Sequence, residues 1–233
     1  CESNLLTELD VSNLNNLTSL NCSNNQLSNL NVNGLTELQN INCQFNQLIN
    51  LNVSNITNLV YLDCSYNQIV TINFNNLLNL EILDCSNNLL ADFDLSDLIS
   101  LLNFDCSYNS LNSINTSNLV SLEELNCNTN SLVSLTIIGL INFNDLNCSN
   151  NLLTSLSLNN LARLTDLNCN YNQLTLINLS ELIGLKNFSC TNNQIIFLDF
   201  SGLSQLQDLN CANNLIASLE LTGLNQLITA NCN

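Results

Sequence analysis

Twelve cysteines are the first residues in this sequence that could carry chemistry, and they recur at a constant interval of 21 residues. A metal site would need ligands at close spacing, such as CxxC pairs, and the sequence contains none. The chain has no histidine, so Ser–His and Cys–His catalytic pairs are excluded. Its basic residues are Arg163 and Lys186, and no basic neighbour activates a thiolate. The sequence therefore predicts that the protein is not an enzyme.

The same spacing bears on disulfide bonds. If the cysteines lie on parallel strands in register, their side chains point the same way about 4.8 Å apart, whereas a disulfide requires facing Cβ atoms about 3.8 Å apart. We therefore predict a row of buried free thiols, with scattered disulfides or a metal site as the alternatives. The row within complete repeats comprises Cys22, Cys43, Cys64, Cys85, Cys106, Cys127, Cys148, Cys169, Cys190 and Cys211.

Acidic residues also follow the 21-residue interval, in two rows: Asp63, Asp84 and Asp105, and then Glu124, Asp145 and Asp166. Carboxylates about 4.8 Å apart repel by about 0.9 kcal/mol even in a water-like dielectric, so we expect the rows to have a use. Calcium, which prefers carboxylate and amide oxygens, is the candidate ion at the first row. The alternative is a solvated acidic face that aids solubility.

Aromatic residues accompany these rows. Phe45, Tyr66 and Tyr108 stand at one repeat position, and Tyr61 lies nearby. Exposed aromatic side chains often anchor protein interfaces and could equally stack on a sugar ring. The alternative is that this repeat position tolerates any residue and that the aromatic residues there have no binding role. We therefore predict one binding site along the strands, formed by Phe45, Tyr61, Asp63, Tyr66, Asp84, Asp105, Tyr108, Glu124, Asp145 and Asp166.

The elements that position these residues come from an internal repeat, LxxLxCxxNxLxxLxLxxLxx, with Leu17 at position one of the first complete copy. Ten full repeats occupy residues 17–226, with partial repeats at both ends. Position nine is always Asn, whose donors and acceptor can satisfy buried loop backbone groups. In the complete repeats these residues are Asn25, Asn46, Asn67, Asn88, Asn109, Asn130, Asn151, Asn172, Asn193 and Asn214.

Two short strands are expected in each repeat, which we call a coil. Leu20 and Cys22 alternate with polar residues in the first half, and Leu30 and Val32 alternate with polar residues in the second. This period of two indicates half-buried strands. We predict a β-rich solenoid with two parallel β-sheets stacked face to face and little or no helix. Position eighteen is Gly, Asn or Asp in every repeat except the one with Glu181. Because Gly, Asn and Asp tolerate a left-handed backbone, we expect a left-handed corner at this position.

The repeat resembles the leucine-rich-repeat family, in particular its short 21-residue bacterial class (IRREKO-type), whose pattern is LxxLxCxxNxLxxLDLxx. LTSLNCSNNQLSNLNVNGL at 17–35 and LEILDCSNNLLADFDLSDL at 80–98 carry the resemblance, which covers the whole chain. It implies a scaffold of secreted or surface-anchored bacterial proteins that bind proteins or glycans. No cofactor is implied, apart from the calcium considered above.

The composition of the chain excludes some classes of binding partner. The formal charge of −17 disfavours nucleic acid and anionic membranes, and no apolar run approaches the ~20 residues of a membrane helix. We predict a single solenoid over 1–233, part of a longer protein without its caps, at the cell surface or outside the cell. The expected function is binding or adhesion to a protein or glycan. The alternatives are a stalk or filament segment that contacts copies of itself and, more remotely, an ice-binding surface.

Overall fold

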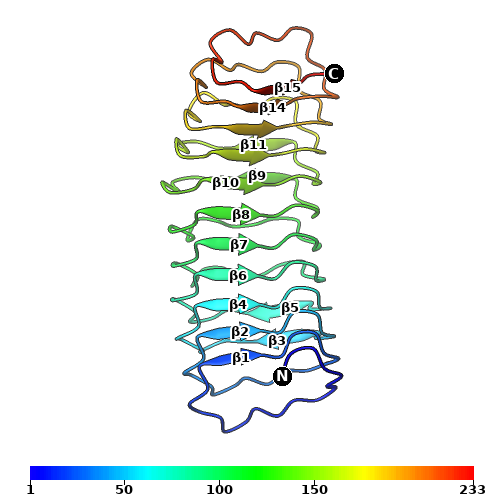
Figure 1. The fold of residues 1–233 in the computed structure, drawn as a ribbon, viewed down its shortest axis with the longest axis vertical. Helices are drawn as coiled ribbons and strands as arrows, with labels where there is room; N and C mark the ends of the chain where they lie inside the picture. The colour runs from blue at the N-terminus through cyan, green and yellow to red at the C-terminus, as the bar shows by residue number, and fades with distance from the viewer. The chain divides into compact units, whose positions relative to one another are not determined.

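A computed structural model describes residues 1–233, and it contains fifteen short β-strands and no helix (Figure 1). None of its elements is therefore a helix long and apolar enough to cross a membrane. The contacts divide the chain into two compact units. Unit 1 comprises Cys1–Leu111 with Asn118–Ser121, and unit 2 comprises Asn112–Ser117 with Leu122–Asn233. That residues 1–233 form a single solenoid stays a prediction.

In unit 1, each coil contributes a strand from repeat positions three to five to one parallel sheet, which we call the first-half sheet. Equivalent positions pair, so that Ser19 faces Asn40 and Tyr61 faces Ile82. Two further strands from the second half of the repeat pair with each other. The first-half strands are β1 (Ser19–Asn21), β2 (Asn40–Asn42), β4 (Tyr61–Asp63), β6 (Ile82–Asp84) and β7 (Asn103–Asp105), and the second-half strands are β3 (Asn50–Asn52) and β5 (Thr71–Asn73).

Unit 2 repeats this arrangement, again with parallel strands whose equivalent positions pair. Its first-half strands are β8 (Glu124–Asn126), β10 (Asp145–Asn147), β12 (Asp166–Asn168), β13 (Asn187–Ser189), β14 (Asp208–Asn210) and β15 (Thr229–Asn231). Its second-half strands are β9 (Ser134–Thr136) and β11 (Ser155–Ser157). The predicted fold class is confirmed, although second-half strands form in only two coils of each unit.

The core of each unit lies between the two halves of its coils. The central residue of a first-half strand points inward, as Leu62 does, and the cysteine two residues later, Cys64, is also fully buried. Leucines such as Leu27 and Leu48 fill the core from position eleven. Each fully buried side chain of this size contributes about 1.5–3 kcal/mol relative to exposure. The apolar positions of the repeat thus hold the coils together and leave the polar positions outside.

Candidate functional site

The position-nine asparagines lie between adjacent coils and bond to both. Asn88 is 6% exposed, and its Nδ2 donates to the carbonyls of Cys64, Cys85 and Ser86 at 3.0–3.1 Å. Its Oδ1 accepts the backbone N–H of Ile69 at 2.9 Å. Because these partners lie on its own coil and on the preceding one, the side chain joins consecutive turns. Asn151 and Asn172 in unit 2 make equivalent bonds.

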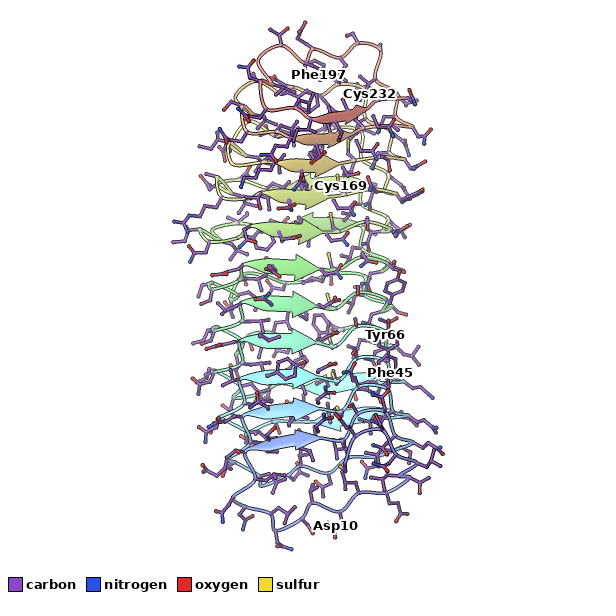
Figure 2. The ribbon with its side chains drawn as sticks, viewed as in Figure 1. Asp10, Phe45, Tyr66, Cys169, Phe197 and Cys232 are labelled. Atoms are coloured by element: carbon purple, nitrogen blue, oxygen red, sulfur yellow. The ribbon has the colours of Figure 1, made fainter.

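The cysteine row lies inside the coils, where Figure 2 labels Cys169. Ten cysteines, Cys22 to Cys211, are buried, and all twelve are free thiols. Burial raises the pKa of Cys22 to about 11 and that of Cys148 to about 12. A thiol with so high a pKa is protonated at neutral pH and is a poor nucleophile and metal ligand. The row therefore acts as small apolar packing.

The first acidic row has a structural role that the sequence interpretation missed. Asp63, at position five, is only 6% exposed, and its Oδ1 accepts the backbone N–H of Ser65 at 3.1 Å and its hydroxyl at 2.7 Å. Asp84 and Asp105 accept the same backbone bond, from the serines two residues later, at 2.9 Å. Such Asx turns suit Asp and Asn equally, which explains why position five holds either residue in nearly every coil.

The geometry does not add support to the calcium hypothesis. No group of three or more His, Cys, Asp or Glu side chains is arranged to hold a metal ion. Burial raises the pKa of Asp84 above its ordinary value, and the like charges of Asp105 and Asp63 raise it further. Tyr61 lies beside this row, with its hydroxyl 3.5 Å from Oδ2 of Asp63, and burial raises the pKa of Tyr61. This face of unit 1 thus holds carboxylates that are engaged in their own coils.

Three of the predicted aromatic residues, Phe45, Tyr66 and Tyr108, stand at a left-handed turn. Position eight has a positive φ in every coil, 52° at Phe45, Tyr66 and Tyr108. Asn, which occupies it in most of the other coils, tolerates this conformation better than an aromatic residue. Phe45 and Tyr66 stack with ring centroids 4.3 Å apart and are 44% and 48% exposed (Figure 2). The sequence interpretation missed this turn, although the asparagines at position eight, such as Asn24, were its signal.

The predicted left-handed corner at position eighteen is present in seven of the ten repeats. The exceptions are Asp97, Asn118 and Glu181. All three residues bond to the preceding coil instead, and Nδ2 of Asn118 donates to the carbonyl of Ser96 at 3.3 Å. The carboxylate of Asp97 accepts the backbone N–H of Asn76 at 2.8 Å, and that of Glu181 accepts the N–H of Asn160 at 2.6 Å. An acidic side chain at this position therefore bonds to the corner of the preceding coil.

The second acidic row lies on the first-half sheet of unit 2. Asp145 pairs in register with Glu124 on one side and with Asp166 on the other. Burial raises the pKa of Asp145, and the charges of Asp166 and Glu124 raise it further. Asp166 accepts hydrogen bonds from Nδ2 of Asn187 at 2.5 Å and from the hydroxyl of Thr165 at 2.6 Å. Whereas the carboxylates of the first row close turns in their own coils, Asp166 thus bonds to a side chain of the following coil, Asn187.

Next to this row the sheet is hollowed, with a volume of about 480 Å³ over β10, β12, β13, β14 and β15. No lysine or arginine lines the hollow. Its polar lining extends beyond Asp166, where the predicted site ended: Asp145, Asn147, Asp166, Asn168, Asn170, Asn187, Ser189, Asp208, Asn210, Thr229 and Asn231. Ser189 was the available signal, because it is the one residue at position five that is smaller than Asn or Asp.

The predicted site is therefore divided. Unit 1 holds Phe45, Tyr61, Tyr66 and Tyr108 with the carboxylates of Asp63, Asp84 and Asp105, whereas unit 2 holds Glu124, Asp145 and Asp166. The structure places each set on the first-half side of its own unit. Of the second set, Asp145 and Asp166 line the hollow of the first-half sheet.

No protein-family model and no curated protein matches the sequence. Among solved structures, the chain is similar to the functional domain of InlJ from Listeria monocytogenes, described as including a cysteine ladder, with 34% identity and a TM-score of 0.93 over 97% of this chain and 51% of that chain. The leucine-rich-repeat protein LIC12759 from Leptospira interrogans is 27% identical, with a TM-score of 0.86 over 94% of this chain and 61% of that one.

YopM, a leucine-rich effector protein from Yersinia pestis, is 25% identical, with a TM-score of 0.83 over 99% of this chain and 64% of that chain. The chain thus spans between about half and just under two thirds of the length of these three proteins. Their likeness extends over nearly the whole of this chain, and the InlJ domain shares both the coil geometry and a row of cysteines.

Proposed function

Because this chain belongs to the leucine-rich-repeat proteins of the short 21-residue class, we propose that it is a non-catalytic binding module for a protein ligand. The observation that carries the proposal is the hollow on the first-half sheet of unit 2. Five adjacent strands contribute side chains to it, so a ligand lying across the strands would meet several coils at once. A regular scaffold that presents a variable outer face suits binding rather than catalysis.

The lining of the hollow favours a ligand rich in hydrogen-bond donors. Asp145, Asp166 and Asp208 supply carboxylate oxygens, and the neighbouring asparagines supply amide groups. Since no basic side chain lines the hollow, the carboxylates are not neutralised from within it. A protein surface carrying Lys, Arg or backbone N–H groups would complement it, because charge-assisted hydrogen bonds are the stronger ones.

We further propose that the module acts outside the cell or on its surface, as part of an adhesive or secreted protein of bacterial origin. The likeness to InlJ of Listeria monocytogenes and to a Yersinia pestis effector protein supports this assignment. The net charge of −17 also supports it, because strong like charge keeps an exposed scaffold soluble.

The test is a protein and glycan array probed with the labelled 233-residue chain and with the double variant Asp145→Asn, Asp208→Asn. Position three holds Asn in other coils, such as Asn40 and Asn187, so the variant keeps a residue that the fold accepts. We expect a protein ligand whose affinity falls at least tenfold in this variant.

The matched control is Glu8→Gln, Glu37→Gln, which removes the same charge from exposed positions of unit 1. Equal losses in both double variants would reduce the effect to net charge, and the hollow would then have no specific role. Ligands that are all glycans would replace the protein ligand with a carbohydrate.

A further inference from the structure

Two adjacent coils of unit 2 break the pattern of position thirteen, on the second half of the repeat. Eight of the ten complete repeats place a polar residue there, for example Ser134 and Ser155. In the other two, the residues are Leu176 and Phe197. The next residues, Ile177 and Leu198, point into the core and are 8% and 2% exposed, so position thirteen must point outward. Core packing therefore does not explain the two large apolar side chains.

Further apolar side chains surround them. Leu176 is 69% exposed, Phe197 64%, Ile196 63% and Leu215 64%, and we call these four residues the Phe197 patch. Backbone hydrogen bonds keep them adjacent: the N–H of Leu215 donates to the carbonyl of Ile195 at 2.9 Å, and that of Ile196 donates to the carbonyl of Thr175 at 3.4 Å. Figure 2 labels Phe197.

Single exposed apolar residues are ordinary, but several large ones on neighbouring coils indicate an interaction surface. Within the patch, Leu176 and Phe197 interrupt an otherwise polar column, and serine at the same position in Ser134, Ser155 and Ser218 shows that the fold accepts a polar residue there. The patch therefore has a reason outside the fold. An aromatic side chain with aliphatic neighbours is the usual anchor of a protein interface.

Two carboxylates on the same outer face define the chemistry of the partner. Asp199 and Glu220 stand at position fifteen of adjacent coils, two residues from position thirteen, and both are fully exposed. Each accepts a backbone N–H two residues later, from Ser201 at 2.8 Å and from Thr222 at 3.1 Å. The pKa of Glu220 is lowered by hydrogen bonds from the hydroxyl and then the backbone N–H of Thr222, and the pKa of Asp199 by those from the backbone N–H and then the hydroxyl of Ser201. Both groups therefore remain negatively charged at neutral pH.

We propose that the Phe197 patch is a second docking surface, which binds a protein segment that carries an apolar anchor flanked by lysine or arginine. The apolar side chains would bury the anchor, while Asp199 and Glu220 would pair with the basic residues. A second copy of this chain fits poorly, because each copy carries a net charge of −17 and only two basic residues. This surface is separate from the hollow of the proposed function, which lies on the first-half sheet.

Selection of phage-displayed random 12-residue peptides on the immobilised 233-residue chain tests the proposal. Peptides that bind the patch should each contain a large apolar residue and at least two Lys or Arg residues. Synthetic copies should bind the variant Leu176→Ser, Phe197→Ser at least tenfold more weakly, measured by fluorescence anisotropy. The variant Asp199→Asn, Glu220→Gln should bind more weakly at low salt and show a smaller dependence on salt.

Two controls isolate the patch. Ile141→Ser, Ile183→Ser removes two other exposed apolar side chains of unit 2, at 73% and 56% exposure, from a position where Ser204 occurs naturally, and it should leave binding unchanged. Asp145→Asn, Asp208→Asn should also leave it unchanged, so failure at this surface and failure of the proposed function are distinguishable. Equal melting temperatures of wild type and variants establish that all are folded.

Four results would overturn the proposal. Selected peptides could bind Leu176→Ser, Phe197→Ser as tightly as wild type. They could also lack basic residues. Ultracentrifugation could instead show a dimer that dissociates in this variant, which would make a second copy the occupant. A glycan that binds wild type and loses affinity for the same variant would make the partner a carbohydrate.

Discussion

Replacing Asn88 with Ala tests whether the position-nine asparagines hold consecutive coils together. The substitution removes four hydrogen bonds, three donated by Nδ2 and one accepted by Oδ1. The N–H of Ile69 then lies in the interior without an acceptor, which costs about 1–3 kcal/mol. The carbonyls of Cys64 and Cys85 lose a donor as well, so we expect a total destabilisation on the order of 3 kcal/mol.

The assay is urea unfolding followed by circular dichroism, with the variants compared by their midpoints, since coils of repeat proteins need not unfold as one unit. Asn29→Ala is the control: Asn29 is an exposed asparagine, and its substitution should change the stability by no more than about 0.5 kcal/mol. Equal costs for Asn88→Ala and Asn29→Ala would refute the reasoning.

Asn88→Asp refines the same test. The carboxylate can still accept the N–H of Ile69, but its second oxygen would face the carbonyls that Nδ2 now contacts. Because an ionised carboxylate there is buried and repelled, its pKa in the folded state should rise above the unfolded value. The variant should therefore be much less stable than wild type at neutral pH and recover part of its stability as the pH falls. A pH-independent loss would contradict this account.

Three other predictions follow from the same geometry. Asp84→Asn keeps the acceptor of the Asx turn. Since the pKa of Asp84 is raised in the folded state, wild type loses stability as the pH rises from the unfolded pKa through the folded one. The variant should therefore melt at a higher temperature than wild type at pH 7, with about 0.9 kcal/mol of repulsion relieved per neighbouring carboxylate, and at the same temperature as wild type at pH 2. An equal melting temperature at pH 7 would count against it. Tyr108→Asn should stabilise the chain by about 1 kcal/mol in chemical denaturation, because Asn tolerates the φ of 52° better, and a loss of stability would show that the ring has a packing role. Ten of the twelve thiols should resist alkylation in the folded protein at pH 8, all but Cys1 and Cys232, and most should titrate as free sulfhydryls in denaturant without reductant; six disulfides found by mass spectrometry would disprove the free row.

The periodic residues were sufficient to predict the fold class, because each repeat position has the same environment in every coil. Alternation around Leu20 and Cys22 indicated the first-half strand, and the structure places β1 at Ser19–Asn21. The spacing of 21 also indicated parallel strands in register, since equal coils place equal positions side by side. Local pattern and global packing agree in such a repeat, so no long-range information is needed.

The candidate site depended on information that a pattern of residue types does not contain. The row of Asp63, Asp84 and Asp105 suggested an ion, but the tertiary structure turns these carboxylates into their own Asx turns. A carboxylate and an amide serve equally as acceptors there, so the sequence alone could not separate a structural role from a ligand.

The sequence marks Ser189 and Phe197 as departures from the repeat pattern, but only the tertiary structure decided what these departures do to the outer surface. The hollow beside Ser189 depends on how the side chains of five strands fill one face, and the exposure of Phe197 depends on what its neighbours leave uncovered. Both are properties of packing across coils, whereas the repeat pattern describes each coil by itself. The sequence therefore determined the scaffold. The packing of one coil against the next determined the accessible shape and charge of its faces, on which binding depends.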